Sequence, residues 1–100
     1  MKYKEELEKI GFKQYPIQED EFSTYDRGWY YDFSDYESLE FTPIEHTRPD
    51  GNSMLKIENL QLYNHFYDET YFSINYELYF KDINEFLNLL KLLGYEMPNK

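Results

Sequence analysis

Several residue types are missing or scarce in this chain of 100 residues. It contains no Cys, no Ala and no Val, and only four Gly and four Pro. The lack of Cys excludes disulfides and thiolate metal sites, and it leaves the redox compartment open. The N-terminal residues are charged where a signal peptide needs an apolar run, and no apolar stretch approaches transmembrane length. We therefore expect a cytoplasmic protein.

Basic residues are also scarce. The chain has 10 Lys and Arg against 20 Asp and Glu, which gives a formal net charge of −10. Nonspecific binding to nucleic acid needs Lys or Arg side chains that displace counterions from phosphates, and no basic cluster is present. Anionic membrane surfaces are disfavoured for the same reason. A basic protein partner, in contrast, would be attracted by the field of the chain.

Aromatic residues take the place of the missing small apolar ones. There are 12 Tyr, 8 Phe and 1 Trp, so the core must be built from few, large side chains. The length suits one domain, residues 1–100, with one core. A core of this size cannot hide 12 Tyr, and several are expected at the surface. This composition is also typical of an AT-rich genome, such as that of a low-GC bacterium or one of its phages.

Two helices are predicted, one near each end of the chain. In residues 2–10 apolar side chains recur on one face, and Gly11 suits the left-handed position that ends a helix. Near the C-terminus, Asp82 and Glu85 form a capping box ahead of an apolar stripe. Gly94 and Pro98 are expected to end that second helix.

Alternating apolar and polar residues predict about four strands, in residues 28–34, 39–42, 53–63 and 70–80. Pro43 indicates a sheet edge or a bulge, and residues 48–52 read as a hairpin turn. The apolar positions of 53–63 change parity, which predicts a bulge near Glu58 and Asn59. Residues 70–80 alternate most regularly and are expected to form one strand. The predicted fold is a two-layer α+β domain, an antiparallel meander flanked by both helices.

No group of residues predicts a catalytic or cofactor site. His65 with Asp68 and Glu69 could bind a metal ion or a small ligand, but a loop histidine beside solvated acids is the simpler interpretation. The serines lack the context of a nucleophile elbow, and the four glycines form no phosphate loop. We therefore expect a protein that is not an enzyme and that uses no cofactor.

The most unusual feature is an acidic, tyrosine-rich segment, residues 19–40. It carries eight acids and one base, a charge of −7 in 22 residues, together with four Tyr. Trp29, Tyr31 and Phe33 are expected to face the core, because they alternate with polar residues. A field of one sign is suited to steering, and tyrosine is enriched at protein interfaces. The predicted partner-binding residues are Glu19, Asp20, Glu21, Tyr30, Asp32, Asp35, Tyr36, Glu37 and Glu40.

These features favour a monomeric inhibitor that binds a basic protein, such as a nuclease or another nucleic-acid-binding protein. Acids that project from a sheet face could imitate a phosphate track and block the channel of that partner. Anti-CRISPR proteins and other small acidic phage proteins that mimic DNA have this general character. The sequence leaves three alternatives open: an immunity protein that neutralises a nuclease toxin, a homo-oligomeric structural domain, and a metal- or small-ligand-binding domain.

Overall fold

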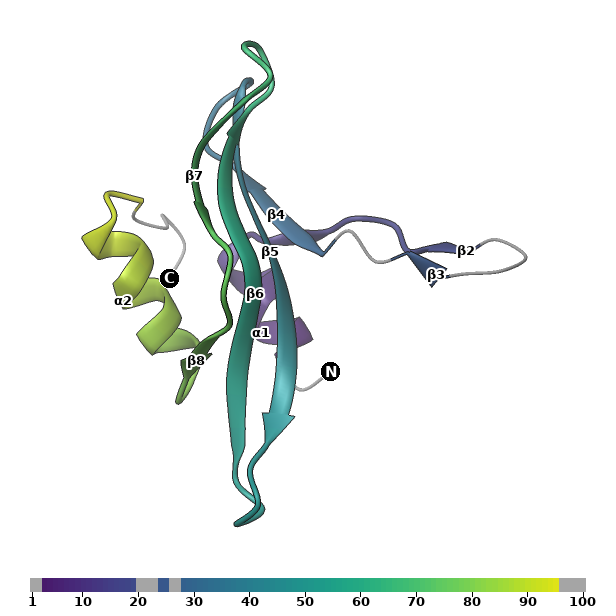
Figure 1. Ribbon diagram of the computed structural model, residues 1–100, viewed down its shortest axis with the longest axis vertical. Coiled ribbons are helices and arrows are strands. Elements are labelled where there is room, and N and C mark those ends of the chain that lie inside the picture. The colour runs from purple at the N-terminus through teal and green to yellow at the C-terminus, as the bar shows by residue number, and fades with distance from the viewer. Residues whose placement is uncertain (1–2, 20–23, 26–27, 96–100) are drawn as a thin grey trace.

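The computed structural model describes residues 3–19, 24–25 and 28–95. Along the chain, a helix comes first, a series of strands follows, and a second helix comes last (Figure 1). The elements are α1 (Lys4–Ile10), β1 (Lys13–Gln14), β2 (Gln18–Glu19), β3 (Thr24–Tyr25), β4 (Trp29–Asp32), β5 (Glu37–Thr47), β6 (Ser53–Asn64), β7 (Glu69–Ile74), β8 (Leu78–Phe80) and α2 (Ile83–Leu92). In the described part of the chain, neither helix is long and apolar enough to cross a membrane.

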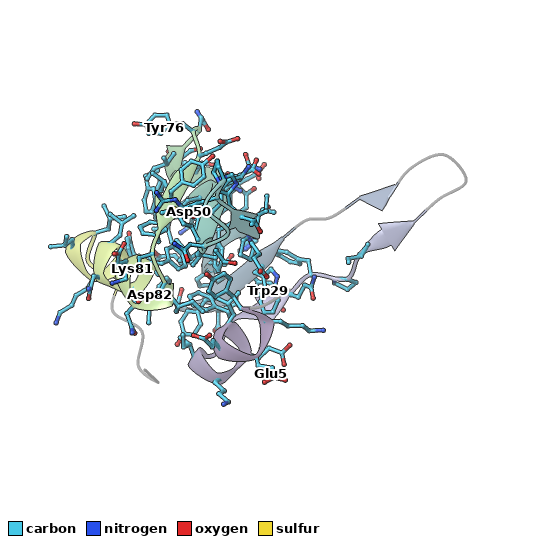
Figure 2. All side chains as sticks on the ribbon, turned by 90° about the horizontal axis from the view of Figure 1, so that it is seen from below. Glu5, Trp29, Asp50, Tyr76, Lys81 and Asp82 are labelled. Atoms are coloured by element: carbon cyan, nitrogen blue, oxygen red, sulfur yellow. The ribbon has the colours of Figure 1, made fainter. Side chains whose placement is uncertain are left out.

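The main sheet is antiparallel, with the strand order β1-β4-β5-β6-β7, and β8 also pairs with β6. The predicted α+β architecture is therefore confirmed, because the meander β4-β5-β6-β7 lies between an N-terminal and a C-terminal helix in the chain. Two short strands, β1 and β8, lie at the margins of this meander. Strands β2 and β3 pair only with each other, and Figures 1 and 2 show them as an arm that lies apart from the main sheet.

The core lies on one face of the sheet, and both helices pack against it. The ring of Phe86, from α2, lies 5.0 Å from that of Phe41 and 6.3 Å from that of Phe12. Each of these three aromatic side chains is at most 2% exposed. The remaining buried apolar residues are Tyr3, Leu7, Ile10, Trp29, Leu39, Leu55, Ile57, Leu60, Leu62, Ile83, Leu87 and Leu90. The strand residues that alternate with these core residues form the opposite side of the sheet, which we call the open face.

The helix ends follow the sequence signals. Gly11 has a φ of 118°, and its N–H donates to the carbonyl oxygens of Leu7 and Glu8. The N–H of Glu85 donates to Asp82 at 3.1 Å, while the Glu85 carboxylate accepts from the N–H of Lys81 at 3.0 Å. These contacts satisfy donors at the first turn of α2. The apolar residues of α2 are not all buried, since Leu92 is 85% exposed.

The predicted bulge in β6 is confirmed at Asn59, which has a φ of 55°. Between the pairs Glu40↔Gln61 and Thr42↔Glu58, two residues of β6 lie opposite Phe41 of β5. The extra residue restores the register, so that Leu55, Ile57, Leu60 and Leu62 all reach the core.

The single strand expected over residues 70–80 is wrong, because it is divided into β7 and β8. The last pair of β7 is Ile74↔Leu60, and the first pair of β8 is Leu78↔Ile57. From Ile74 to Leu78 the chain therefore advances by four positions, whereas β6 advances by three between Ile57 and Leu60. Because of the bulge in β6, the intervening segment leaves the ladder, and Tyr76 is 74% exposed instead of facing the core.

The pairing of β4 with β5 accounts for the positions of Pro43 and Gly28. Strand β4 pairs with β5 only from Ser38 to Phe41, so Pro43 lies where β5 pairs with β6 alone. This position fits the edge-or-bulge expectation for a residue that lacks an N–H. Gly28, just before β4, has a φ of 85°, and a Cβ there would lie 2.4 Å from the carbonyl oxygen of Phe41. The backbone can make this approach only with glycine.

Candidate interaction surface

Two turns meet at one end of the main sheet. The turn between β4 and β5 and the turn between β6 and β7 lie together at the top of Figure 1. The N–H of His65 in the second turn donates to the carbonyl oxygen of Tyr36 in the first, at 2.6 Å. We call this end the acidic tip, and it comprises Asp32, Asp35, Tyr36, Glu37, Phe66, Tyr67, Asp68 and Glu69.

Side-chain hydrogen bonds fix both turns of the acidic tip. In the first turn, the Ser34 hydroxyl accepts from the N–H groups of Tyr36 and Glu37, at 3.2 and 3.1 Å. In the second turn, Asn64 is only 5% exposed, and its side-chain oxygen Oδ1 accepts a hydrogen bond from the N–H of Tyr67 at 2.9 Å. The amide nitrogen of Asn64 donates to the hydroxyl of Tyr71 at 2.9 Å. A buried amide with both ends bonded gives the turn a defined shape.

Three aromatic rings stand exposed on the acidic tip. Tyr36 is 52% exposed, Phe66 65% and Tyr67 67%. Their rings touch in sequence, with centroids 5.2 Å apart for Tyr36 and Phe66 and 4.9 Å apart for Phe66 and Tyr67. Rings of this size bury large area when they pack into a partner, and an exposed group of them marks an interaction surface.

All of the charged side chains in the acidic tip are acidic. Its five carboxylates are those of Asp32, Asp35, Glu37, Asp68 and Glu69, and none of them forms an ion pair with any residue that the structure describes. The segments that build this end, residues 28–47 and 57–80, contain no Lys and no Arg. Within the described part of the chain, no ion pair therefore offsets the negative potential at this end.

The centre of the open face is different, because its polar groups bond to one another. The Glu40 carboxylate accepts from the Tyr15 hydroxyl at 2.5 Å and from the Gln61 amide at 2.8 Å. The rings of Tyr15 and Tyr30 stack with centroids 4.3 Å apart. Tyr15 directly follows β1 and precedes the β2–β3 arm, so these contacts hold the base of the arm against the sheet.

Lys56 neutralises the acids in the lower half of the open face. Its ammonium lies 3.4 Å from the Glu58 carboxylate and 3.5 Å from that of Glu77. Burial lowers the pKa of Lys56, but the hydrogen bond and charge of Glu58 outweigh it and raise that pKa. The Tyr79 hydroxyl donates to Glu77 at 2.8 Å. That hydrogen bond, with the charge of Lys56, lowers the pKa of Glu77, and the same bond raises the pKa of Tyr79.

The far end of the open face carries two cations. A hollow of about 520 Å³ lies beside the β5–β6 hairpin loop and is lined by Arg48, Asn52, Ser53, Met54 and Lys81. Figure 2 views this end of the molecule and labels Asp50 and Lys81. Arg48 lies 3.7 Å from the carboxylate of Asp50, with both side chains about half exposed, which is a weak pair. Charge on the open face is thus graded from the acidic tip to the hairpin.

Comparison with protein-family models, curated proteins and solved structures finds no match to this chain. The geometry of its own side chains therefore carries the functional argument.

The structure separates the predicted partner-binding residues into three groups. Four of them, Asp32, Asp35, Tyr36 and Glu37, belong to the acidic tip. Tyr30 and Glu40 lie lower on the open face, Glu19 lies in β2, and Asp20 and Glu21 lie outside the described residues.

One part of this prediction was wrong, since the acids do not all share the open face. Glu37 has the same parity as Leu39, which is buried in the core, and it therefore lies on the helix side of the sheet. Burial raises the pKa of Tyr95, whose ring packs on Phe33 and Phe72 at this side, and the charge of Glu37 adds to that effect.

Sequence reasoning missed Phe66 and Tyr67 as surface residues. They lie in the loop that was interpreted through His65, Asp68 and Glu69. Two adjacent aromatic residues inside a polar turn were the available signal, because a turn has no inner face on which both rings could be buried.

The structure does not bring His65, Asp68 and Glu69 together as metal ligands. Within the described ranges, no three His, Asp or Glu side chains are placed to hold a metal ion. The His65 Nε2 instead lies 2.6 Å from the Ser38 hydroxyl. A serine–histidine contact of this kind occurs in hydrolases, but Ser38 is 1% exposed, so its hydroxyl is out of reach of a substrate.

Proposed function

We propose that this protein is a small acidic inhibitor that binds a basic nucleic-acid-binding protein and blocks its substrate channel. The observation that carries the proposal is the acidic tip, where three exposed aromatic rings share two adjoining turns with five carboxylates that form no ion pair among the described residues. Elsewhere on the open face, acids are neutralised by Lys56 or bonded within the sheet. The tip therefore combines a field for attraction with apolar area for tight contact.

The shape of this end suits entry into a groove. Strands β4, β5, β6 and β7 are neighbours in the sheet, and strands lie about 4.8 Å apart, so the tip is roughly 15 Å wide between its outer strands. A channel that admits a nucleic acid is lined by Lys and Arg side chains that normally contact phosphates. Carboxylates at the end of a narrow sheet can contact the same side chains, and the body of the molecule then obstructs the channel.

The test compares two variants with the same change in charge. Asp35→Asn, Asp68→Asn and Glu69→Gln together neutralise three acids of the tip. Glu5→Gln, Glu6→Gln and Glu8→Gln neutralise three exposed acids of α1, far along the chain from the tip. The tagged chain and both variants are used to purify partners from extracts of the native host, and retained proteins are identified by mass spectrometry.

We expect the unmodified chain and the α1 variant to retain a basic nucleic-acid-binding protein, and the tip variant to lose it. Added nucleic acid should release that protein, and the affinity should fall steeply as salt rises. Retention of a partner that neither salt nor nucleic acid displaces would contradict the proposal. Equal losses for both variants would assign the effect to net charge and would contradict the role of the tip.

A further inference from the structure

We infer that the acidic tip recognises arginine side chains of its partner in preference to lysine. The inference rests on the proposed function, since it specifies the chemistry by which a basic partner is bound. Its structural basis is the three rings of Tyr36, Phe66 and Tyr67, which belong to the same two turns as the carboxylates of the acidic tip.

The ring geometry leaves aromatic faces available. The rings of Tyr36 and Phe66 meet at 64°, and those of Phe66 and Tyr67 at 89°. In such edge-to-face contacts one ring presents its edge to its neighbour, so its own faces stay free of that contact. All three residues are more than half exposed, so these faces are within reach of a partner. A planar guanidinium stacks on an aromatic face, whereas an ammonium is compact and strongly hydrated.

In both turns, acidic residues are neighbours of the aromatic residues in the sequence. Asp35 directly precedes Tyr36, and Asp68 and Glu69 directly follow Tyr67. A guanidinium that stacks on a ring keeps its N–H groups free at its edge, where a carboxylate can accept two parallel hydrogen bonds. Lysine has no equivalent of this double contact. The combination of free rings and adjacent carboxylates is therefore selective for arginine and does not serve both cations equally.

A tyrosine on the open face, Tyr79, lies in a group that already contains a cation of the chain. The ring of Tyr79 touches that of His46, and its hydroxyl bonds to Glu77, which pairs with Lys56. At the acidic tip, among the residues that the structure describes, no Lys or Arg fills the corresponding place.

The experiment uses two short peptides that differ only in their cation, one with alternating Arg and Gly and the other with alternating Lys and Gly. Their affinities for the full chain are measured by calorimetry at matched ionic strength. We expect the arginine peptide to bind roughly five- to tenfold more tightly, as cation–π and bidentate contacts at an exposed site predict. Amide signals of residues 65–69 should shift on titration with it.

The variant Phe66→Leu with Tyr67→Leu retains apolar area and removes two ring faces. It should reduce the preference for arginine to near one while binding of the lysine peptide changes little. The control is Tyr76→Leu, which removes an exposed ring outside the tip and should leave the preference unchanged.

Equal affinities for the two peptides, binding of neither, or a preference that survives in the Phe66 and Tyr67 variant would each overturn the inference. The proposed function is judged separately, by displacement of the captured partner with nucleic acid. If the inhibitor bound its partner through lysine side chains, nucleic acid would still displace the partner, but the arginine peptide would not bind more tightly than the lysine peptide.

Discussion

Asn64 offers the sharpest test of how the fold shapes the acidic tip. We consider its replacement by alanine. The side chain is 5% exposed and makes two hydrogen bonds of 2.9 Å, one to the N–H of Tyr67 and one to the hydroxyl of Tyr71. Each such bond contributes about 1 kcal/mol net to the free energy of unfolding, so Asn64→Ala should lower that free energy by about 2 kcal/mol.

Both global stability and local order can be measured. For a domain of this size, about 2 kcal/mol corresponds to a fall in Tm of roughly 10 °C, which calorimetry resolves easily. Urea titration should give the same loss of free energy with an unchanged m-value. Hydrogen exchange of the Tyr67 amide should accelerate more than that of the β6 core amides, because this N–H loses its acceptor. Partner binding should weaken as well, since a less ordered turn must be fixed on association.

Two further variants decide whether this account is right. Asn75→Ala removes an exposed asparagine whose side chain bonds only to Ser73 among the described residues, and it should change the free energy of unfolding by less than about 0.5 kcal/mol. In a Tyr71→Phe background, Asn64→Ala should destabilise by only about 1 kcal/mol, because one of the two bonds is already absent. If Asn64→Ala alone left both stability and Tyr67 exchange unchanged, the reasoning would be refuted.

Three other predictions concern the rest of the sheet. Gly28→Ala should destabilise by at least about 2 kcal/mol in urea titration, because the added Cβ meets the Phe41 carbonyl at a positive φ. Asn59→Val should cost about 1–2 kcal/mol, while Asn59→Gly stays within about 0.5 kcal/mol, since only the β-branched residue resists the left-handed backbone. The hydrogen bond from Tyr79 and the charge of Lys56 lower the pKa of Glu77. The ionised Glu77 therefore stabilises the fold fully at a pH above the usual glutamate range, and this stabilisation disappears as the pH falls and the carboxylate is protonated. The difference in unfolding free energy between the unmodified chain and Glu77→Gln should therefore vanish in acid, and a difference that grew in acid would contradict this sign.

Local signals in the sequence located the helix ends, the hairpin and the bulge. Gly11 and the Asp82–Glu85 capping box act through contacts within a few residues, so their roles could be predicted without the rest of the fold. The parity change along 53–63 likewise predicted the extra residue, which the structure places at Asn59. These features depend on local backbone geometry.

The rest depended on neighbours that a single strand does not reveal. Residues 70–80 alternate with period two throughout, yet the strand breaks because β6 beside it advances by three residues where this segment advances by four. For a similar reason, the sequence did not predict which residues come together in the acidic tip. Tyr36 and Phe66 are thirty positions apart, and only the pairing of β5 with β6 brings their turns together.

The β5–β6 hairpin loop has a practical consequence for work with this protein. Its backbone is closed by hydrogen bonds from the N–H of Arg48 to the carbonyl oxygen of Asn52 and from the N–H of Gly51 to that of Arg48, and Gly51 has a φ of 88° that disfavours a side chain there. The 12 residues of β6 separate this loop from the acidic tip, a distance of roughly 40 Å for an extended strand. A fluorophore or a biotin attached at Asn52, an exposed residue of this loop, would therefore tether the molecule to a surface with its aromatic end directed away from the support.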